Sequence, residues 1–339
     1  MTPQQLPVTP SGQGWRRGMH HARARVRARR ALVILMWMGL GGPATVRAWD
    51  DFGHMTVAAV AWQHLTPAAR TQASRLLHLN PDYPRWVSAV APADRDVTAF
   101  LLAATWPDAI KHEAGYRNEG ERPEGAGADQ NIGYEDRQEH RYWHFVDVPF
   151  SADGTTLPGV PTPNAATRLE DFRRVLADPG VPAATRSYDL TWVLHLIGDI
   201  HQPLHAVSRF THELPAGDLG GNRIRLCAPP CRLQLHYFWD AALGHGTPAD
   251  ALALSQQLPP PAARRIADLR IQDWLDESGR LAREVAYQSP IGSGAGPYLL
   301  TPAYRHAAQD VARHQVALAG RRLAVLLNNA FADRHIIVR

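Results

Sequence analysis

The chain has 339 residues, of which 45% are hydrophobic and 20% are charged, and it contains only two cysteines. This composition excludes a disordered chain, a collagen-like fibre and a small disulfide-dense scaffold. The sequence pI of about 9.3 suggests binding to nucleic acid or to an anionic membrane. Eight of the arginines, however, lie within residues 1–48, which hold no acidic residue. The rest of the chain carries 28 basic against 32 acidic groups, so the body of the protein is acidic.

The first 48 residues have the order of a secretory signal peptide, in which positive charge precedes an apolar stretch and a small-residue stop. Arginines lie between positions 23 and 30, the apolar stretch covers 31–40, and the stop ends at Ala48. The apolar stretch is shorter than the roughly 20 residues of a membrane-spanning helix, which disfavours an uncleaved anchor. We therefore predict cleavage between Ala48 and Trp49 and an exported protein, periplasmic or secreted, that is not held in a membrane.

From Trp49 onward the sequence is typical of helices. Thr66 followed by Pro67 predicts a helix N-terminus, with the helix continuing to about Leu79. Apolar residues at three- and four-residue spacing predict further helices over 94–106, 164–177, 183–202, 262–287 and 304–329. Alternation appears only around 222–226 and 232–235, where a short hairpin is expected. We predict a single all-α domain over residues 49–339, with long loops over 112–140 and 150–163 and at most this hairpin as β structure.

The two cysteines, Cys227 and Cys231, lie four residues apart in the loop of the expected hairpin. An exported protein meets an oxidising compartment, which permits a disulfide that closes this small loop. A two-cysteine zinc site would need further ligands nearby, and none are arranged for it. We favour the disulfide, with two free thiols as the alternative.

Histidine and aspartate recur at a spacing that places both on one face of a helix. His195 and Asp199 are four residues apart, and His236 and Asp240 repeat that spacing. His205 follows the first pair just after Pro203, where the chain can turn back toward it. One such pair is more often a salt bridge or a helix cap. Two pairs together with His205 indicate zinc, which takes nitrogen and oxygen ligands.

Six blocks of the sequence resemble the S1/P1 nuclease family, whose members are zinc-dependent enzymes of single-stranded nucleic acid, related in fold to bacterial zinc phospholipase C. The blocks cover residues 49–54, 105–111, 143–147, 195–205, 218–222 and 235–240. They follow one another in the order of the family and span nearly all of the chain after residue 48. The resemblance implies a mostly helical fold of the phospholipase C/P1 nuclease type.

The resemblance also implies three zinc ions per chain. It assigns Asp108, His144, His195 and Asp199 to the first ion, His205, His236 and Asp240 to the second, and His54, Asp199 and Trp49 to the third. Trp49 would bind through its terminal amine and its own carbonyl oxygen. Signal-peptide removal would then also be an activation step, because the Trp49 nitrogen has no lone pair to donate while it is part of an amide.

The catalytic and substrate-binding residues follow from the same resemblance. Zinc lowers the pKa of bound water to about 7, so water can attack phosphorus near neutral pH and leave 5′-phosphorylated products. Asp108 would orient the water and Lys111 would lie beside the phosphate, unless it is a solvated surface lysine. Phe145 would stack on an unpaired base, unless it belongs to the core, and Asp147 would read the base edge. Asn222 would contact phosphate or fix a turn.

These assignments imply a monomer that hydrolyses single-stranded RNA and DNA and 3′-nucleotides. A zinc phospholipase C-like enzyme is one alternative, although a lipid head group offers no base for Phe145 and Asp147. A non-catalytic exported zinc-binding protein is the other. It would need the metal ligands but not Lys111, Phe145 or Asp147.

Overall fold

A computed structural model of the protein describes residues 49–120, 127–227 and 230–332, and the predicted signal peptide over 1–48 lies outside this part. The α-helices are α1 (Asp51–His64), α2 (Pro67–Leu77), α3 (Tyr83–Val87), α4 (Arg95–Ala103), α5 (Trp106–Ala109), α6 (Ala165–Ala177), α7 (Ala183–His201), α8 (Pro203–Ala206), α9 (Leu235–Asp240), α10 (Pro248–Ser255), α11 (Ala263–Ala267), α12 (Ile271–Leu281) and α13 (Pro302–Ala330). Short helical turns are η1 (Pro92–Asp94), η2 (Ile110–His112), η3 (Gly133–Glu135), η4 (Arg141–Trp143) and the π-helical η5 (Ala282–Ala286). The strands are β1 (Val148–Phe150), β2 (Val207–Arg209), β3 (Arg225–Leu226) and β4 (Leu233–Gln234).

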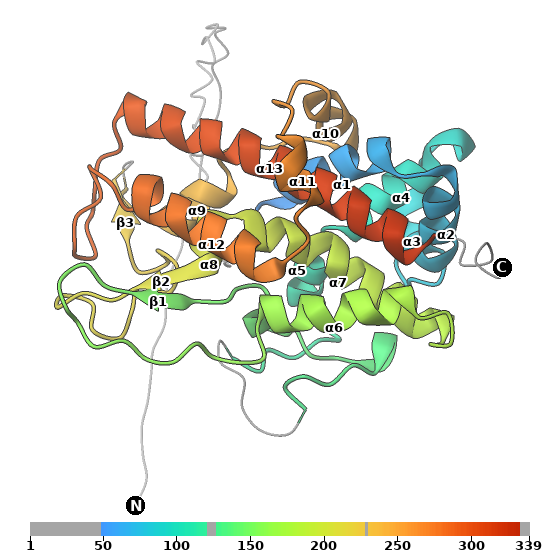
Figure 1. Cartoon of the computed structure of the whole chain (residues 1–339), viewed down its shortest axis with the longest axis horizontal. Coiled ribbons are helices and arrows are strands. Elements are labelled where there is room, and N and C mark those ends of the chain that lie inside the picture. The colour runs from blue at the N-terminus through green and yellow to red at the C-terminus, as the bar shows by residue number, and fades with distance from the viewer. Residues whose placement is uncertain (1–48, 121–126, 228–229, 333–339) are drawn as a thin grey trace, which may run out of the picture. The chain divides into compact units, whose positions relative to one another are not determined.

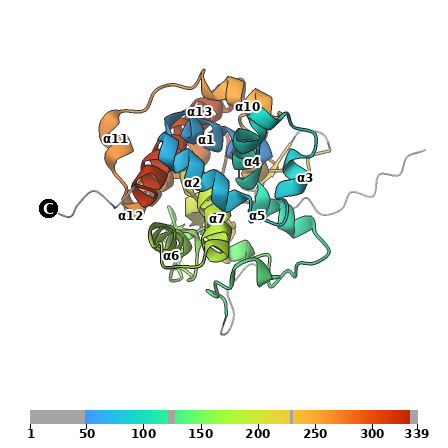
Figure 2. The ribbon, with the colours of Figure 1, turned by 90° about the vertical axis from the view of Figure 1, so that its right-hand side faces the viewer.

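Two helices, α1 and α7, form the centre of the described domain. Helix α1 is buried from Phe52 to Ala61 and α7 from Ser187 to His201, so neither presents a polar face to solvent over these stretches. A helix without a solvated face must be enclosed by other elements. Helices α13, α10 and α4 pack against α1, while α6, α2 and α13 pack against α7 (Figures 1 and 2).

The predicted all-α class is confirmed, and several helix ends form for the expected reasons. Thr66 caps α2 by accepting a hydrogen bond from the Ala69 amide, and Asn164 forms a capping box at the start of α6. Helix α7 ends at His201, two residues before Pro203, and the short helix α8 begins at that proline.

The single helix predicted over 262–287 is wrong, because α11 ends at Ala267 and α12 begins only at Ile271. Between them the Asp268 carboxylate accepts hydrogen bonds from the backbone amide and the guanidinium of Arg270. An aspartate that bonds the backbone two residues on competes with the helical hydrogen-bond pattern. Hydrophobic periodicity does not report this local competition.

The strands include one feature that the sequence did not predict. The antiparallel hairpin β3–β4 forms where alternation indicated it, and Cys227 and Cys231 are disulfide-bonded in its loop. A second pair, β1 and β2, is parallel, with Val148 opposite Val207. Three-residue strands are too short to show a period of two, so the expectation of a hairpin alone was wrong. In Figure 1 this pair lies on the left, at the end of the domain away from α2 and α3.

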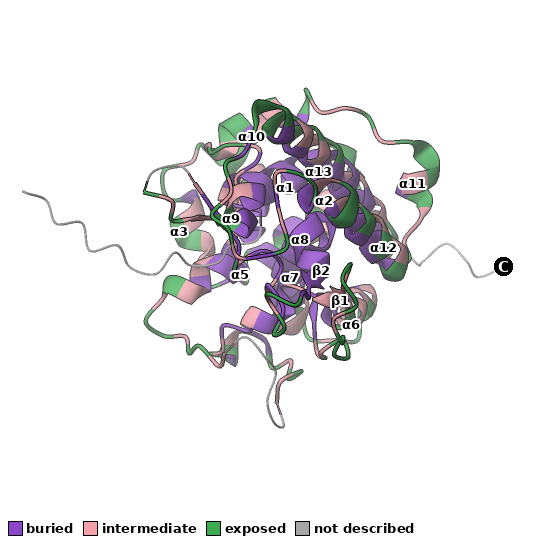
Figure 3. Ribbon diagram, turned by 90° about the vertical axis from the view of Figure 1, so that its left-hand side faces the viewer, coloured by how far each residue is buried: buried purple, intermediate pink, exposed green. Residues whose placement is uncertain are grey.

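No helix of the described ranges is both long and apolar enough to span a membrane. The burial view in Figure 3 shows the purple, buried stretches of α1, α7, α8 and β2 gathered in the middle of the domain. Three of these elements carry candidate ligands: His54 lies on α1, His195 and Asp199 on α7, and His205 on α8. The buried centre of the domain therefore consists mostly of apolar side chains and contains one cluster of polar side chains.

A buried carboxyl on α7 gives a testable prediction about stability. Asp189 is fully buried, both of its oxygens accept from Asn131 Nδ2, and burial raises the pKa of its carboxyl to about 8. Because this folded pKa lies above the unfolded value of 3.8, stability falls as pH rises between these values. Asp189→Asn is expected to raise Tm by roughly 10 °C at pH 7.5 and to leave it unchanged near pH 4.

The measurement is Tm against pH by calorimetry, at fixed metal concentration. Asp96→Asn, at a half-exposed position on α4, is the matched control and should leave the curve unchanged. Parallel Tm curves for wild type and Asp189→Asn across pH 4–8 would show that Asp189 is not the titrating group.

Candidate metal centre

Three groups of buried histidine and aspartate side chains lie at the centre of the domain. Within each group the candidate ligand atoms lie within 4.8 Å of one another. The first group is Asp108, His144 and His195, the second is His205, His236 and Asp240, and the third is His54, His195 and Asp199. All of these residues are at most 2% exposed. Their residues come from α1, α5, the C-cap of η4, α7, α8 and α9, so the site depends on the whole fold.

The first group forms where α7 meets α5 and the residue after η4. His195 Nδ1 donates to the Ala104 carbonyl, which leaves Nε2 as the nitrogen that faces the group. His144 Nδ1 lies 2.9 Å from His195 Nε2 and 3.2 Å from Asp199 Oδ2. Asp108 Oδ1 lies 3.7 Å from His144 Nδ1. Two imidazole nitrogens and two carboxylates thus converge on one point.

In the second group two unprotonated nitrogens face each other. His205 Nδ1 donates to the His144 carbonyl and His236 Nδ1 donates to the Gly220 carbonyl, both at 2.7 Å. Burial lowers the pKa of His205 to about 4 and also lowers that of His236, so both rings are neutral and carry their single proton on Nδ1. Their Nε2 lone pairs are only 3.1 Å apart, with the Asp240 carboxylate 3.6–3.7 Å away. A cation between these groups turns a repulsive arrangement into an attractive one.

The carboxylate of Asp199 joins the first group to the third. Its Oδ2 lies 3.3 Å from His195 Nε2, and its Oδ1 lies 3.3 Å from His54 Nε2. The glycine before it, Gly198, makes room for this arrangement, since a Cβ there would lie 2.8 Å from His54 Nδ1. Trp49 is fully buried beside them, and its indole donates to the Gly198 carbonyl at 3.0 Å. The first residue of the predicted mature chain therefore lies against the third group.

The polar atoms of these groups fit a set of metal ions. Among the described residues, the atoms without a hydrogen-bond partner include both ring nitrogens of His54, both oxygens of Asp199, His144 Nε2, Asp108 Oδ2 and Asp240 Oδ2. Buried polar atoms are rarely left in this state, because each costs free energy. Burial also lowers the pKa values of His54, His144 and His195 well below the usual range. Their rings are therefore neutral, and each has a nitrogen lone pair that can bind a metal ion. Nitrogen and carboxylate donors in these numbers suit transition metals such as zinc.

Lys111 belongs to this centre rather than to the surface. Its side chain is 5% exposed, and Nζ donates to Asp108 Oδ1 at 2.6 Å. The turn η2 follows α5 directly, so the three-residue spacing brings both side chains to one side. The alternative of a solvated lysine is wrong.

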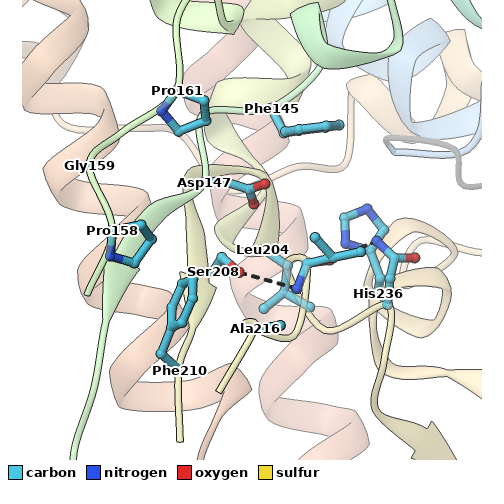
Figure 4. A pocket seen from close by; sticks show the side chains of 12 residues that line it. Phe145, Asp147, Pro158, Gly159, Pro161, Leu204, Ser208, Phe210, Ala216 and His236 are labelled. Atoms are coloured by element: carbon cyan, nitrogen blue, oxygen red, sulfur yellow. Dashed lines mark hydrogen bonds between the residues drawn. The ribbon is translucent and has the colours of Figure 1, made fainter. Parts of the chain in front are cut away.

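The predicted substrate residues lie around one cavity beside the second group. Phe145, Asp147 and Asn222 line a cavity of about 220 Å³, and His236 forms part of the same lining (Figure 4). Phe145 is half-buried, and Asp147 adopts a left-handed backbone conformation with φ of 55°. Non-glycine residues at positive φ are uncommon and are concentrated at functional sites. The metal centre and the cavity are therefore neighbours.

The segment between His144 and Asp147 is held from two sides. The Val146 amide donates to the His205 carbonyl, and the Phe145 carbonyl accepts from the Ala165 amide at the start of α6. Immediately after Asp147, strand β1 pairs with β2. The aromatic ring and the carboxylate are fixed relative to the second group by these backbone bonds.

Two further polar residues at the site were not predicted from the sequence. Gln202 is fully buried, donates from Nε2 to Asp240 Oδ1 at 2.7 Å, and so orients that carboxylate. Ser208 accepts from the Leu219 amide and fixes one wall of the cavity (Figure 4). A signal for Gln202 was available, since it lies directly between two candidate ligands and precedes a proline. Ser208 carries no such signal.

Comparison with known proteins identifies the family. The model of the S1/P1 Nuclease family matches residues 49–332. The chain belongs to the S1/P1 nuclease family. Endonuclease 1 of Arabidopsis thaliana is 26% identical over 337 residues, covering 91% of this chain and 95% of the relative. Endonuclease 2 of the same plant is 23% identical over 230 residues, covering 65% of this chain and 63% of the relative.

The resemblance stated from the six sequence blocks is thus confirmed. This S1/P1 family protein is a nuclease, a hydrolase of phosphodiester bonds in nucleic acid, and its family depends on metal ions. The nuclease carries three groups of side chains that could hold such ions, at the place where the blocks meet.

Metal binding should be visible in the stability of the nuclease. We expect Tm to be at least about 10 °C higher in Zn²⁺ than in a chelator that has removed the metal. The reason is that a ligand at a thousand times its Kd contributes about 4 kcal/mol of stability per site. Mg²⁺ should raise Tm much less, since it prefers oxygen ligands. Equal Tm values in chelator and in Zn²⁺ would contradict a metal centre here.

Proposed function

We propose that this nuclease is an exported, zinc-dependent endonuclease and 3′-nucleotidase that acts on single-stranded RNA and DNA. The observation that carries the proposal is the shared lining of the Phe145 cavity and the second ligand group, through His236. A base held in that cavity would have its sugar and phosphate next to buried nitrogen and carboxylate donors. The nuclease activity of the family agrees with this arrangement.

The proposed centre takes three zinc ions. Asp108, His144, His195 and Asp199 would hold the first, His205, His236 and Asp240 the second, and His54, Asp199 and the freed amine and carbonyl of Trp49 the third. The separate orientation of the two Asp199 oxygens, toward His195 and toward His54, supports a carboxylate shared between two ions. When bound, zinc supplies Lewis-acid chemistry, lowering the pKa of water and offsetting negative charge on phosphate.

The residues of the chain orient the reaction around these ions. Asp108 Oδ1 accepts a hydrogen bond from Lys111 Nζ, while Asp108 Oδ2 has no hydrogen-bond partner among the described residues. Asp108 therefore offers one oxygen that can accept a proton from the attacking water. The Lys111 ammonium lies where it can offset charge on the phosphate. Attack at phosphorus with loss of the 3′ oxygen leaves a 5′-phosphate on the product.

The cavity accounts for the proposed preference for single strands. Phe145 offers an aromatic face that stacks on any base, but only on a base that has left its own stack. Asp147 offers a carboxylate to the N–H groups on the base edge. Asn222 Nδ2 donates to the Leu219 carbonyl, which fixes the turn and leaves Oδ1 without a hydrogen-bond partner in the described chain. Asn222 therefore both shapes the turn and offers an acceptor to the substrate.

Lipid phosphodiesters are the less favoured substrates. An enzyme of the zinc phospholipase C type acts on a lipid head group, which has no base. It would not need an aromatic ring and a carboxylate in one cavity beside the second group. The nuclease relatives also favour nucleic acid. A protein that only stores zinc would not require Lys111 buried against a ligand.

Export and maturation belong to the same proposal. Cleavage between Ala48 and Trp49 would give a monomeric mature domain over residues 49–339, outside the membrane, with Trp49 at its N-terminus. The Asp50 amide donates to the Asp240 carbonyl at 3.1 Å, and the Trp49 indole donates to Gly198. These two bonds would hold the new terminus against both the second and the third group. The first residue of the predicted mature chain would therefore be one of the residues proposed to bind zinc.

The main test is N-terminal sequencing of the exported protein, together with zinc counting and activity gels on single-stranded DNA and RNA. The expected result is Trp49 as the first residue, about three zinc ions per chain and cleavage of both polymers. A variant produced with Ala48 retained should lose about one zinc ion and most activity, because its Trp49 nitrogen remains an amide. One zinc ion per chain in a fully active protein would contradict the trinuclear centre.

The role of Phe145 is tested separately. Phe145→Ala is expected to raise KM for single-stranded DNA about tenfold, since stacking contributes roughly 1–3 kcal/mol per base, while kcat changes little. Phe145→Tyr keeps the ring and should retain the wild-type KM. Steady-state kinetics on one oligonucleotide provide the measurement, and zinc counting shows that the centre is intact. A loss of kcat with unchanged KM would contradict a stacking role.

A further inference from the structure

The wall of the cavity that lies across from the metal centre is formed by an uncharged segment, residues 157–161. Pro158, Gly159 and Pro161 line the cavity, and Figure 4 shows them on the opposite side from His236. From residue 154 to residue 163 the chain has no charged side chain. A strand that leaves the cavity on this side meets apolar surface rather than acidic groups.

Two large apolar side chains of this segment are turned toward solvent. Leu157 and Val160 are each 43% exposed. The described chain has only a few large hydrophobic side chains with comparable exposure. Each is next in the chain to a residue that lines the cavity, Leu157 to Pro158 and Val160 to Gly159 and Pro161, so the apolar surface of the segment extends beyond the cavity lining. Exposed apolar surface beside a binding cavity is typical of a surface that a ligand covers.

The segment is held in place at both ends, so it is ordered before substrate binds. On one side the Phe210 amide donates to the Phe150 carbonyl, and the Asp153 carboxylate accepts from the His212 amide at 2.8 Å. On the other side Asn164 Nδ2 donates to the Pro161 carbonyl at 2.8 Å. Prolines at 158 and 161 further restrict the backbone. A platform that is already ordered loses little entropy when a ligand rests on it.

We infer that Leu157 and Val160 form a platform for the second nucleoside of the substrate, the one next to the nucleoside in the Phe145 cavity. This inference rests on the proposed function and adds to it a subsite that only polymers occupy. A base adjacent to an unstacked base is itself exposed on one face, and an apolar surface removes that face from water. A 3′-mononucleotide fills the cavity alone and does not reach the platform.

The inference predicts a change for polymers only. Leu157→Ser/Val160→Ser is expected to raise KM for a short single-stranded oligoadenylate about 3- to 10-fold, because the apolar contact is lost. KM for 3′-AMP, and kcat for both substrates, should stay within about twofold of wild type. Both side chains are on the surface, so the folded structure should tolerate the change. Steady-state kinetics on the zinc-loaded, exported protein provide the measurement.

A matched control is Leu79→Ser, which changes a 47% exposed leucine just after α2, at the other end of the domain in Figure 1. It should leave both KM values unchanged. The platform is overturned if oligoadenylate KM stays at the wild-type value, or if both KM values rise together, which would mean that the segment only shapes the cavity. It is also overturned if the double variant keeps its KM but loses self-association in sedimentation or binding to phosphatidylcholine vesicles. Wild-type protein that cleaves neither substrate would instead refute the proposed function.

Discussion

The structure depends on buried nitrogen and oxygen atoms whose lone pairs repel one another unless a positive charge lies between them. In the second group two imidazole lone pairs face each other at 3.1 Å beside the Asp240 carboxylate. Burying such atoms without a partner costs free energy. The fold holds them in position through their other ring nitrogens, which donate to the carbonyls of His144 and Gly220. Ligand orientation is therefore set by the protein before any ion binds, which favours metal selectivity.

The same bonds connect the ligand groups to one another. The carbonyl of His144, a residue of the first group, accepts from His205 of the second. The Asp50 amide, next to Trp49, donates to the Asp240 carbonyl. Asp199 faces two groups with its two oxygens. A substitution in one group therefore displaces residues of another, and the effects of ligand substitutions should not be additive.

How much of this could be predicted from the sequence depended on whether the relevant signal was local. His195 and Asp199 share a face because of helical pitch, so their spacing was informative. Asp108 and His144 lie on short helical turns without any period, and only the resemblance to a family indicated them. Helix α1 is buried on all sides over most of its length, so it has no amphipathic contrast to detect. The parallel pair β1–β2 is stabilised by tertiary contacts, which residues 148–150 alone do not encode.

In the proposed function, charge separates the part of the molecule that catalyses the reaction from the part that selects the substrate. The chain after residue 48 carries more acidic than basic groups, so the protein body repels a polyanion. Three divalent ions held by Asp108, Asp199 and Asp240 would leave an excess of positive charge at the centre, to which Lys111 adds. Attraction over distance would then come from the metal centre. In the proposed function the base would lie between Phe145 and the uncharged segment 157–161, with Asp147 as the acidic group of the cavity lining. An aromatic and apolar wall of this kind would discriminate by whether a base is unstacked, which is the property that separates single strands from duplexes.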